Sequence, residues 1–368
     1  MYVKQLELKN FRNYQGAFLS PHPRLTVLTG QNAQGKTNVL EALHLCCLGR
    51  SHRTAHDREL IRWGTERAAV RLQVARTDGT HDIAVTLTQD GRRKQVKVGG
   101  TQIGRIGELM GHFHGILFSP EDLAIIKQGP AERRKLVDME LSQLYPAYFY
   151  TLQRYMRALN QRNSLLREMQ RGHGGSAATL QAWDEQLVQA GAHIVGQRRA
   201  YLALLAQAAA ASYAGISGGT EALGLRYQTQ IDSDGDKAQL AAQFLHRLRE
   251  TRADDIRRGS TSVGPHRDEM RLTLNGREAR VYGSQGQQRT VMLSLRLAEL
   301  EVVRMERGET PVLLLDDVMS ELDPFRRRQL LERIADAQTL ITCTDESDLA
   351  GASIGAVYRV REGTLTPA

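Results

Sequence analysis

The segment that most constrains the fold of this chain is Gly30-Gln31-Asn32-Ala33-Gln34-Gly35-Lys36-Thr37, which has the spacing G-x-x-x-x-G-K-T. An apolar run precedes it at Leu25–Thr29, and apolar residues at helical spacing follow it as far as Leu48. In such a strand–loop–helix unit the loop N–H groups bind phosphate oxygens, Lys36 neutralises the β- and γ-phosphates, and Thr37 offers a hydroxyl to Mg²⁺. The segment therefore predicts an α/β protein that binds a nucleoside triphosphate with Mg²⁺.

A second chemical signal lies at the end of the apolar run 312–315, where Asp316 and Asp317 follow. A run of this kind predicts a buried strand of a parallel sheet, and ligands of such sheets bind beyond the carboxyl ends of the strands. Asp316 is therefore the predicted Mg²⁺ ligand beside Thr37, directly or through water. Asp317 is the candidate that polarises an attacking water, so these two acids are the predicted catalytic residues.

Two further segments precede helical patterns, and each allows two interpretations. Asp323 stands before Pro324, so it either caps a helix or acts across an interface between two copies of the chain. The other segment consists of four small or polar residues: Ser284, Gln285, Gly286 and Gln287. They form either a second anion site at a helix N-terminus, which the chain's own phosphate loop does not need, or an ordinary helix start.

Together these motifs resemble the ABC-type ATPases of the SMC group, and most closely the RecF family of bacterial gap-repair proteins. Six more stretches carry the resemblance: LKNFRNY at 8–14, GRSHRT at 49–54, FSPEDL at 118–123, GPAERRKLVD at 129–138, GPHRDE at 264–269 and SQGQQR at 284–289. The match covers nearly the whole chain. The resemblance implies a P-loop NTPase fold of the ABC type.

For individual residues, the resemblance implies that the loop 30–37 binds ATP and that Ser284 touches the γ-phosphate held by an opposing subunit. Asp323 then lies in a D-loop that crosses this interface, and two heads close around two ATP molecules as a homodimer. The Q-loop residue stays open between Gln128 and the FSPEDL segment.

The resemblance also implies a cellular role and partners. The ATP-bound dimer would clamp gapped, single-stranded or junction DNA in recombinational gap repair and replication-fork recovery. With mediators of the RecR and RecO type it would promote RecA loading on single-stranded gaps and SOS induction.

Two residues depart from the wider ABC pattern. Asp317 stands where a glutamate is usual, and Thr344 stands where a switch histidine is usual. A shorter acid and a missing histidine predict a weak, DNA-stimulated ATPase in which ATP mainly sets the state of the dimer.

The distribution of patterns along the chain predicts two lobes. Strand-like runs dominate residues 1–120 and return after residue 256, whereas the residues between them follow helical spacing. We therefore expect an α/β head, lobe I, assembled from both chain ends (1–120 and 257–368), with an inserted helical lobe II (121–256). The insertion is too short for the long coiled coils of chromosome-organising SMC proteins, and no C-x-x-C zinc hook occurs.

The charge balance fits a nucleic-acid partner. Forty-nine Lys and Arg against forty-one Asp and Glu give a formal net charge of +8, which suits a polyanion and also serves solubility. Two basic runs are candidates for contacts with DNA phosphates, although each is equally compatible with a solvated surface: Arg92-Arg93-Lys94 and Arg133-Arg134-Lys135.

Other features favour a cytoplasmic protein without a membrane partner. No uninterrupted apolar run reaches the roughly 18 residues of a membrane span, and the N-terminus alternates like a strand rather than a secretory signal. Three cysteines, Cys46, Cys47 and Cys343, lie in apolar contexts without metal-ligand spacing, so we expect structural roles for them.

Three other classes remain as alternatives. The nucleotide-binding subunit of a transporter shares the ATP site, but it usually has a switch histidine. A GTPase or small-molecule kinase leaves SQGQQR and SELD unexplained, and the chain has no N-K-x-D guanine motif. A structural ATP-binding protein that never hydrolyses its ligand stays open because of Asp317.

Overall fold

Residues 1–368 are described by a computed structural model, except 91–92, 173, 175, 232–234 and 350. The chain divides into two units, each built from segments that are distant in sequence. The first contains Met1–Leu123, Ala211–Thr220 and Arg289–Ala368, and the second contains Ala124–Ala210 and Glu221–Gln288.

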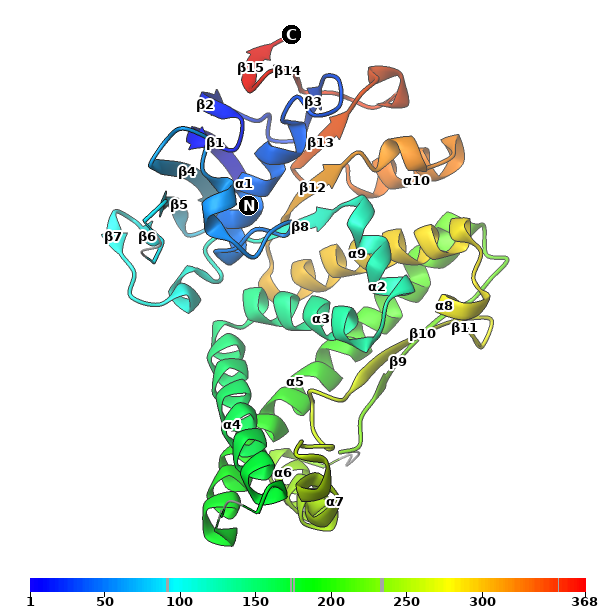
Figure 1. Ribbon diagram of the computed structural model, residues 1–368. Coiled ribbons are helices and arrows are strands. Elements are labelled where there is room, and N and C mark those ends of the chain that lie inside the picture. The colour runs from blue at the N-terminus through cyan, green and yellow to red at the C-terminus, as the bar shows by residue number, and fades with distance from the viewer. Residues whose placement is uncertain (91–92, 173, 175, 232–234, 350) are drawn as a thin grey trace. The chain divides into compact units, whose positions relative to one another are not determined.

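The first unit contains a mainly parallel sheet that joins strands from both ends of the chain (Figure 1). Its strand order is β15-β14-β3-β13-β12-β8. The strands are β3 (Leu25–Thr29), β8 (Gly115–Phe118), β12 (Val312–Asp316), β13 (Thr339–Cys343), β14 (Ala356–Arg361) and β15 (Thr364–Pro367), of which only β15 is antiparallel to its neighbour. Every residue of β3, β12 and β13 is buried, which is why their sequences are nearly continuous apolar runs.

A second, antiparallel sheet in the same unit has the order β2-β1-β4-β5-β6-β7. Its strands are β1 (Tyr2–Phe11), β2 (Tyr14–Leu19), β4 (Arg67–Arg76), β5 (Gly79–Thr88), β6 (Gln95–Val98) and β7 (Thr101–Gln102). Along β4, buried Val70, Leu72 and Val74 alternate with more exposed residues. One face of this sheet is therefore packed and the other faces solvent.

Helix α1 (Lys36–Leu48) contacts strands of both sheets, which explains why apolar residues surround it almost completely. It ends at Gly49, whose φ of 66° is left-handed and whose added Cβ would lie 2.3 Å from Ile106 Cδ1. The unit also contains α10 (Pro324–Arg333) and the short 3₁₀ helices η1 (Asp57–Leu60), η2 (Ile106–Leu109), η3 (Pro120–Asp122), η4 (Met319–Glu321) and η5 (Glu346–Leu349). The long helix α9 (Gln285–Arg307) contributes residues to both units.

The second unit combines helices with a three-stranded sheet of order β11-β10-β9. Near the turn between α4 and α5, Leu165 and Leu166 pack against Leu180, as expected for an antiparallel helix pair. Two glycines of that predicted turn, residues 172–176, flank positions 173 and 175, which lie outside the described residues. The elements are α2 (Leu123–Lys127), α3 (Pro130–Leu144), α4 (Pro146–Gln170), α5 (Ala177–Ser217), α6 (Lys237–Glu250), α7 (Arg252–Arg258), α8 (Ala279–Tyr282), β9 (Leu223–Gln228), β10 (Glu269–Leu274) and β11 (Arg277–Glu278).

The second unit differs from the expected lobe II at its C-terminal boundary. We expected a purely helical insertion that ends at residue 256, but this unit extends to Gln288. The reason is β9, which lies inside the predicted helical block and pairs with β10 along its whole length, from Glu269↔Gln228 to Leu274↔Leu223. A strand's partner is not visible in its own sequence, so the pairing could not be foreseen.

Helix α5 requires a second correction. Among the described residues, this one helix is long and apolar enough to cross a membrane by length and composition alone. It nevertheless carries Arg198, which is 3% exposed and donates hydrogen bonds to Asp138 at 2.8 and 3.0 Å within the second unit. Buried, paired arginines are typical of packed helices, and a core helix of a soluble protein passes the same length test.

Candidate functional site

The loop between β3 and α1 has the backbone that a phosphate cradle requires. Gly30 and Gly35 adopt φ values of 151° and 116°. A Cβ added to Gly30 would lie 2.4 Å from Val360 O, and one added to Gly35 would lie 2.6 Å from Asn13 Nδ2. Both positions therefore exclude larger residues, for steric as well as conformational reasons. The α1 N-terminus, where unpaired N–H groups collect, begins directly after Gly35.

Lys36 folds over this loop. Its ammonium donates hydrogen bonds to the carbonyl oxygens of Gly30 and Gln31, the latter at 2.9 Å. Only 7% of the residue is exposed, and burial lowers the pKa of the ammonium, while the carboxylates of Asp317 and Asp316 act in the opposite direction. The charge is thus placed over the loop and held by carbonyl groups that a bound phosphate can replace.

Asp316 and Thr37 meet, although 279 positions separate them in the sequence. Thr37 Oγ1 donates to Asp316 Oδ1 at 2.9 Å, and Thr342 Oγ1 donates to the same oxygen at 2.7 Å. Burial raises the pKa of Asp316, and the two hydroxyl donors oppose that shift. The predicted pair of Mg²⁺ ligands therefore lies together as a set of oxygen atoms, the donor type that Mg²⁺ prefers.

Asp317 follows with a left-handed backbone, at a φ of 51°. Its N–H donates to Thr342 Oγ1 at 2.9 Å, so one threonine hydroxyl binds both acids of the motif. Asp317 is close enough to Lys36 for its charge to raise the lysine pKa. Sequence reasoning missed Thr342; the signal available was a polar residue within the otherwise apolar run of β13.

Two turns brace the loop from outside. Asn13 Nδ2 donates to Gln34 O at 2.7 Å, and Asn13 Oδ1 accepts from Asn38 Nδ2 at 2.9 Å. From the other turn, Glu362 N donates to Gln34 Oε1 at 2.7 Å. Asn13 belongs to the LKNFRNY stretch, so the family pattern marked this region without assigning the contact.

The stretch 49–54 folds back along α1 and is held by a buried acid. Glu41 accepts from Arg12 at 2.6 and 2.8 Å and from Ser51 at 2.5 Å. Burial raises the pKa of Glu41, but the hydrogen bonds from Arg12 and Ser51 outweigh it and hold the pKa below its ordinary value. Arg53 Nη1 then reaches Asn38 Oδ1 at 3.1 Å, next to the brace of the phosphate loop.

His52 is a site residue that sequence reasoning did not find. Within the described ranges, neither of its ring nitrogens has a hydrogen-bond partner, and its ring centroid lies 5.1 Å from that of His44. Burial lowers its pKa, against the carboxylates of Glu41, Asp316 and Glu121. A neutral imidazole with free nitrogens therefore lies in the electrostatic neighbourhood of Asp316.

The FSPEDL stretch begins at the carboxyl end of β8, whose Phe118 pairs with Leu315. Its Asp122 receives two hydrogen bonds from Arg296, at 2.7 and 3.1 Å, and the charge of Glu121 raises the pKa of Asp316. Gln128, the other Q-loop candidate, belongs to the second unit, where its carbonyl accepts from Arg133. The FSPEDL stretch is thus the candidate that lies beside Asp316 in its own unit.

The signature segment forms a reciprocal cap at the start of α9. Ser284 Oγ accepts from Gln287 N at 3.2 Å, and Gln287 Oε1 accepts from Ser284 N at 2.7 Å. Gln287 also donates to Glu221. Ser284 and Gln285 are exposed, and a Cβ added to Gly286 would meet no atom within 4 Å. The helix start is real, and its outer surface is open.

Asp323 caps α10, as the first of its two interpretations requires. Its Oδ1 accepts from Arg326 N at 3.0 Å and its Oδ2 from Arg326 Nη1 at 2.6 Å. The hydrogen bond from the Arg326 backbone and the nearby guanidinium hold the pKa of Asp323 below its ordinary value. Its carboxylate is about half exposed, so the cap leaves one side accessible.

Comparison with known proteins places this arrangement in a family. A family model described as the RecF/RecN/SMC N terminal domain matches residues 2–365. The DNA replication and repair protein RecF of Acetivibrio thermocellus is 41% identical over 363 residues, which span 98% of both chains. The chain belongs to the RecF family. The RecF of Halothermothrix orenii is 42% identical over 372 residues, covering 100% of this chain and 99% of that protein.

Solved structures agree with this membership. A structure of the recombination mediator protein RecF-ATPrS in the RecFOR pathway matches with a TM-score of 0.92 and 36% identity, covering 100% of this chain and 98% of the other. An Smc head domain from Pyrococcus furiosus matches with a TM-score of 0.59 at 15% identity, which shows the shared fold alone. The expected α/β ABC-type fold is therefore confirmed.

The basic runs proposed as DNA contacts are placed unequally in this RecF-family chain. Arg133 is 6% exposed and forms a bidentate pair with Glu269, at 2.7 and 3.0 Å, and Arg134 donates to Asp268 O at 2.8 Å. These two guanidinium groups are engaged inside the second unit. Lys135 is exposed, with Glu132 3.5 Å away.

In the other basic run, Lys94 pairs with Asp57 at 2.8 Å, and Arg93 is exposed. Arg92 lies outside the described residues. Of the six basic residues, Arg93 and Lys135 are thus the described ones with the most accessible charge.

The cysteines have no chemical role in the site. Cys46, Cys47 and Cys343 are all buried and unbridged, as expected for structural residues. Among the described residues no group of three or more His, Cys, Asp or Glu side chains is arranged to hold a metal.

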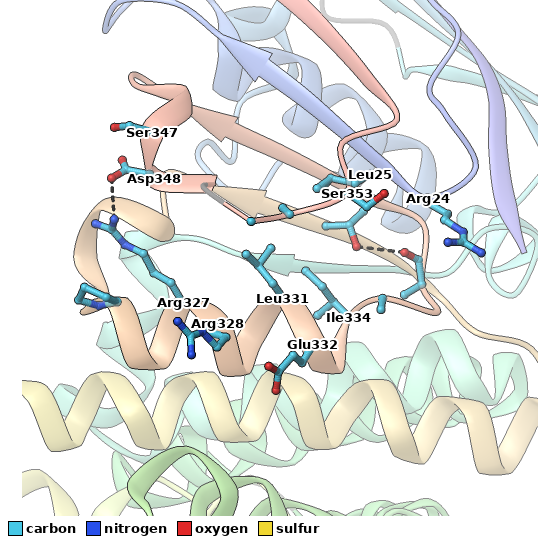
Figure 2. A pocket seen from close by; sticks show the side chains of 16 residues that line it. Arg24, Leu25, Arg327, Arg328, Leu331, Glu332, Ile334, Ser347, Asp348 and Ser353 are labelled. Carbon is cyan, nitrogen blue, oxygen red and sulfur yellow. Dashed lines mark hydrogen bonds and ion pairs between the residues drawn. The ribbon is translucent and has the colours of Figure 1, made fainter.

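A separate groove of about 670 Å³ lies beside α10 in the first unit (Figure 2). Leu25, Leu331 and Ile334 form apolar parts of its lining. Arg327 pairs with Asp348 at 2.8 Å and donates to Met319 O at 2.7 Å. One arginine therefore links α10 to both η4 and η5, the 3₁₀ helices that follow β12 and β13.

Proposed function

We propose that this chain is an ATP-dependent DNA-binding protein of recombinational gap repair and replication-fork recovery. The observation that carries the proposal is the meeting of Thr37 and Asp316, 2.9 Å apart, beside a loop that Lys36 covers. Relatives named RecF, a DNA replication and repair protein, and solved structures named RecF-ATP and RecF-ATPrS support it.

In this proposal the loop N–H groups and Lys36 bind the phosphates of ATP. The ammonium exchanges the carbonyl oxygens of Gly30 and Gln31 for the β- and γ-phosphate oxygens. Thr37 and Asp316 hold Mg²⁺, which neutralises charge on the phosphates. Since burial raises the pKa of Asp316, a cation at this carboxylate favours the ionised form that binding needs.

Hydrolysis is slow in this scheme. Asp317 polarises the attacking water from a backbone position fixed by Thr342. Thr344, which stands in place of a switch histidine, is exposed. The aspartate is one methylene shorter than the usual glutamate, so water is positioned less favourably and the chain acts as a weak, DNA-stimulated ATPase.

The signature segment acts in trans. Ser284 to Gln287 at the α9 N-terminus receive the γ-phosphate held by a second copy, and Asp323 lies at the same interface. Two ATP molecules then bind per homodimer, as a two-fold symmetric arrangement requires. The exposure of Ser284 and the open space at Gly286 support this assignment.

The closed dimer binds DNA and mediator partners. The net charge of +8 favours phosphate contacts, and Arg93 and Lys135 are the accessible candidates from the basic runs. A related structure is described as a recombination mediator in the RecFOR pathway, which supports partners of the RecR and RecO type. Promotion of RecA loading and of the SOS response, in the cytoplasm, completes the proposal.

The decisive experiment measures molecular mass in solution, with and without ATP and Mg²⁺, followed by DNA binding on the same samples. We expect ATP to convert monomer to dimer in the parent chain, and Lys36→Ala and Ser284→Arg to abolish the conversion. Ser176→Arg is the matched control, because Ser176 accepts from Thr179 N at 3.0 Å and so also caps a helix, away from the signature. A mass that ignores ATP, with DNA binding unchanged, would reject the clamp and favour the transporter-subunit or structural alternative.

A further inference from the structure

Trp63 is exposed to an extent that is unusual for its residue type. Its relative exposure is 94%, the highest among the exposed large hydrophobic side chains. The other tryptophan, Trp183, packs against the cluster of Leu165, Leu166 and Leu180. Tryptophan is on average highly buried, and a free indole surface marks a place where something binds.

The turn that carries Trp63 is held by hydrogen bonds on both sides. Arg62 N donates to Asn10 O at 2.8 Å, and Thr65 donates to Arg62 O from its N–H at 3.1 Å and its hydroxyl at 2.8 Å. Gly64 supplies the left-handed φ of 79° that closes the turn. The indole is therefore displayed from an ordered backbone, so little entropy is lost when a ligand covers it.

The same turn is connected to the phosphate loop. Arg62 Nη1 donates to Asn13 O, and Asn13 Nδ2 donates to Gln34 O at 2.7 Å. Asn13 thus holds the Trp63 turn with its backbone and the phosphate loop with its side chain. A ligand whose phosphates occupy the loop 30–37 has its remaining groups in this part of the first unit.

We propose that Trp63 is the stacking platform for the base of the nucleotide whose phosphates bind at the loop 30–37, which rests on the proposed ATP site. An indole face offers area and polarisability but no hydrogen-bond code, so it binds any purine and discriminates weakly between adenine and guanine. Specificity for the triphosphate comes from the loop, and additional affinity for the base comes from the turn.

The test uses Trp63 as its own reporter. The variant Trp183→Phe leaves one tryptophan, and the further change Ser284→Arg keeps the chain from pairing through its signature segment. Emission of Trp63 is followed during titration with ATP and Mg²⁺, and separately with inorganic tripolyphosphate, which has no base. We expect ATP to quench the emission and tripolyphosphate to leave it unchanged.

Affinity measured by calorimetry in the otherwise unaltered chain gives the second readout. Trp63→Ala is expected to weaken ATP binding roughly tenfold, within the range of about 5- to 150-fold that corresponds to stacking of one base, and to leave tripolyphosphate binding unchanged. Trp63→Phe keeps an aromatic face and is expected to retain most of the affinity. Phe18→Ala, which removes another exposed aromatic from the antiparallel sheet, is the matched control and is expected to change neither affinity.

The outcomes separate this inference from the proposed function. If ATP binds in a Lys36-dependent way, but Trp63 emission and the affinity of Trp63→Ala do not change, the stacking role is refuted and the ATP site stands. If the parent chain binds no ATP, the proposed function fails as well. Quenching that requires DNA, or that appears only where a second copy associates, would assign the indole to a different occupant and overturn the inference.

Discussion

Replacing Thr342 with valine tests the link between the two acids at the end of β12. The Thr342 hydroxyl is fully buried, donates to Asp316 at 2.7 Å and accepts from Asp317 N at 2.9 Å. Loss of a hydrogen bond to a carboxylate removes about 1.5–3 kcal/mol, and loss of a neutral one removes about 0.5–1.5 kcal/mol. The new methyl group offsets about 0.8 kcal/mol, so we expect a net destabilisation of about 2–3 kcal/mol.

The assay is urea-induced unfolding of the nucleotide-free chain at pH 7. Thr339→Val is the matched control, because Thr339 lies on the same strand, is 1% exposed, and donates only one neutral bond, to Ala337 O at 3.2 Å. This control is expected to lose less than about 1 kcal/mol. Equal losses in the two variants would refute the argument, since the effect would then come from the strand and not from the shared hydroxyl.

The pH dependence of Thr342→Val gives the same prediction a second check. Burial already raises the pKa of Asp316, and removal of a donor raises it further. An acid with a raised folded-state pKa contributes stability at low pH, and this contribution is lost as the pH rises through the folded-state pKa. The deficit of Thr342→Val should therefore be larger at pH 8 than at pH 5, and a deficit that grows in acid would contradict the assignment.

Three further predictions concern burial and capping. Burial lowers the pKa of His44 to about 3, so the folded state resists protonation and stability falls as the pH drops below 6.5, by about 2 kcal/mol at pH 5 from this residue alone; unfolding of His44→Gln should show a shallower dependence between pH 7 and 5. Arg162, 0% exposed, pairs with Asp184 at 2.7 Å and Asp255 at 2.8 Å, so Arg162→Ala should destabilise by about 3–5 kcal/mol in denaturant titrations; a loss below about 1 kcal/mol would mean that the acids find other partners. Asp323→Ala should lose about 1 kcal/mol of stability through the cap, whereas Asp323→Asn should keep the cap; if Asp323→Asn also keeps ATP-driven dimerisation, the carboxylate charge has no role at the interface.

Much of the fold follows from local pattern. The helix expected at Lys36–Leu48 and the strands expected at Leu25–Thr29 and Val312–Asp316 have the same bounds in the structure. These elements are long apolar runs or start at a loop of defined chemistry, so neighbouring residues alone specify them. Strand β9 was missed because it is short, partly exposed and defined by its pairing with β10.

The site divides in the same way. Residues that belong to motifs, such as Lys36 and Asp316, could be assigned from spacing, and the structure brings Asp316 to Thr37. Thr342 and His52 act through position in space, which single-sequence spacing does not encode. Arg133 shows the converse: a basic run suggested a DNA contact, but a buried Glu269 neutralises the guanidinium, and that partner lies 136 positions away.

The strand order of the parallel sheet has a consequence for synthesis of the chain. β3 and β8 emerge from the ribosome early, yet they cannot pair with each other, because β13 and β12 lie between them. Between Phe118 and Val312 the ribosome adds 194 residues, which takes about 10–40 s at 5–20 residues per second. During that time the edges of both strands have no partner and are open to wrong pairing. A chain truncated before β12 has a phosphate loop without Asp316, so only full-length copies can present Thr37 and Asp316 together.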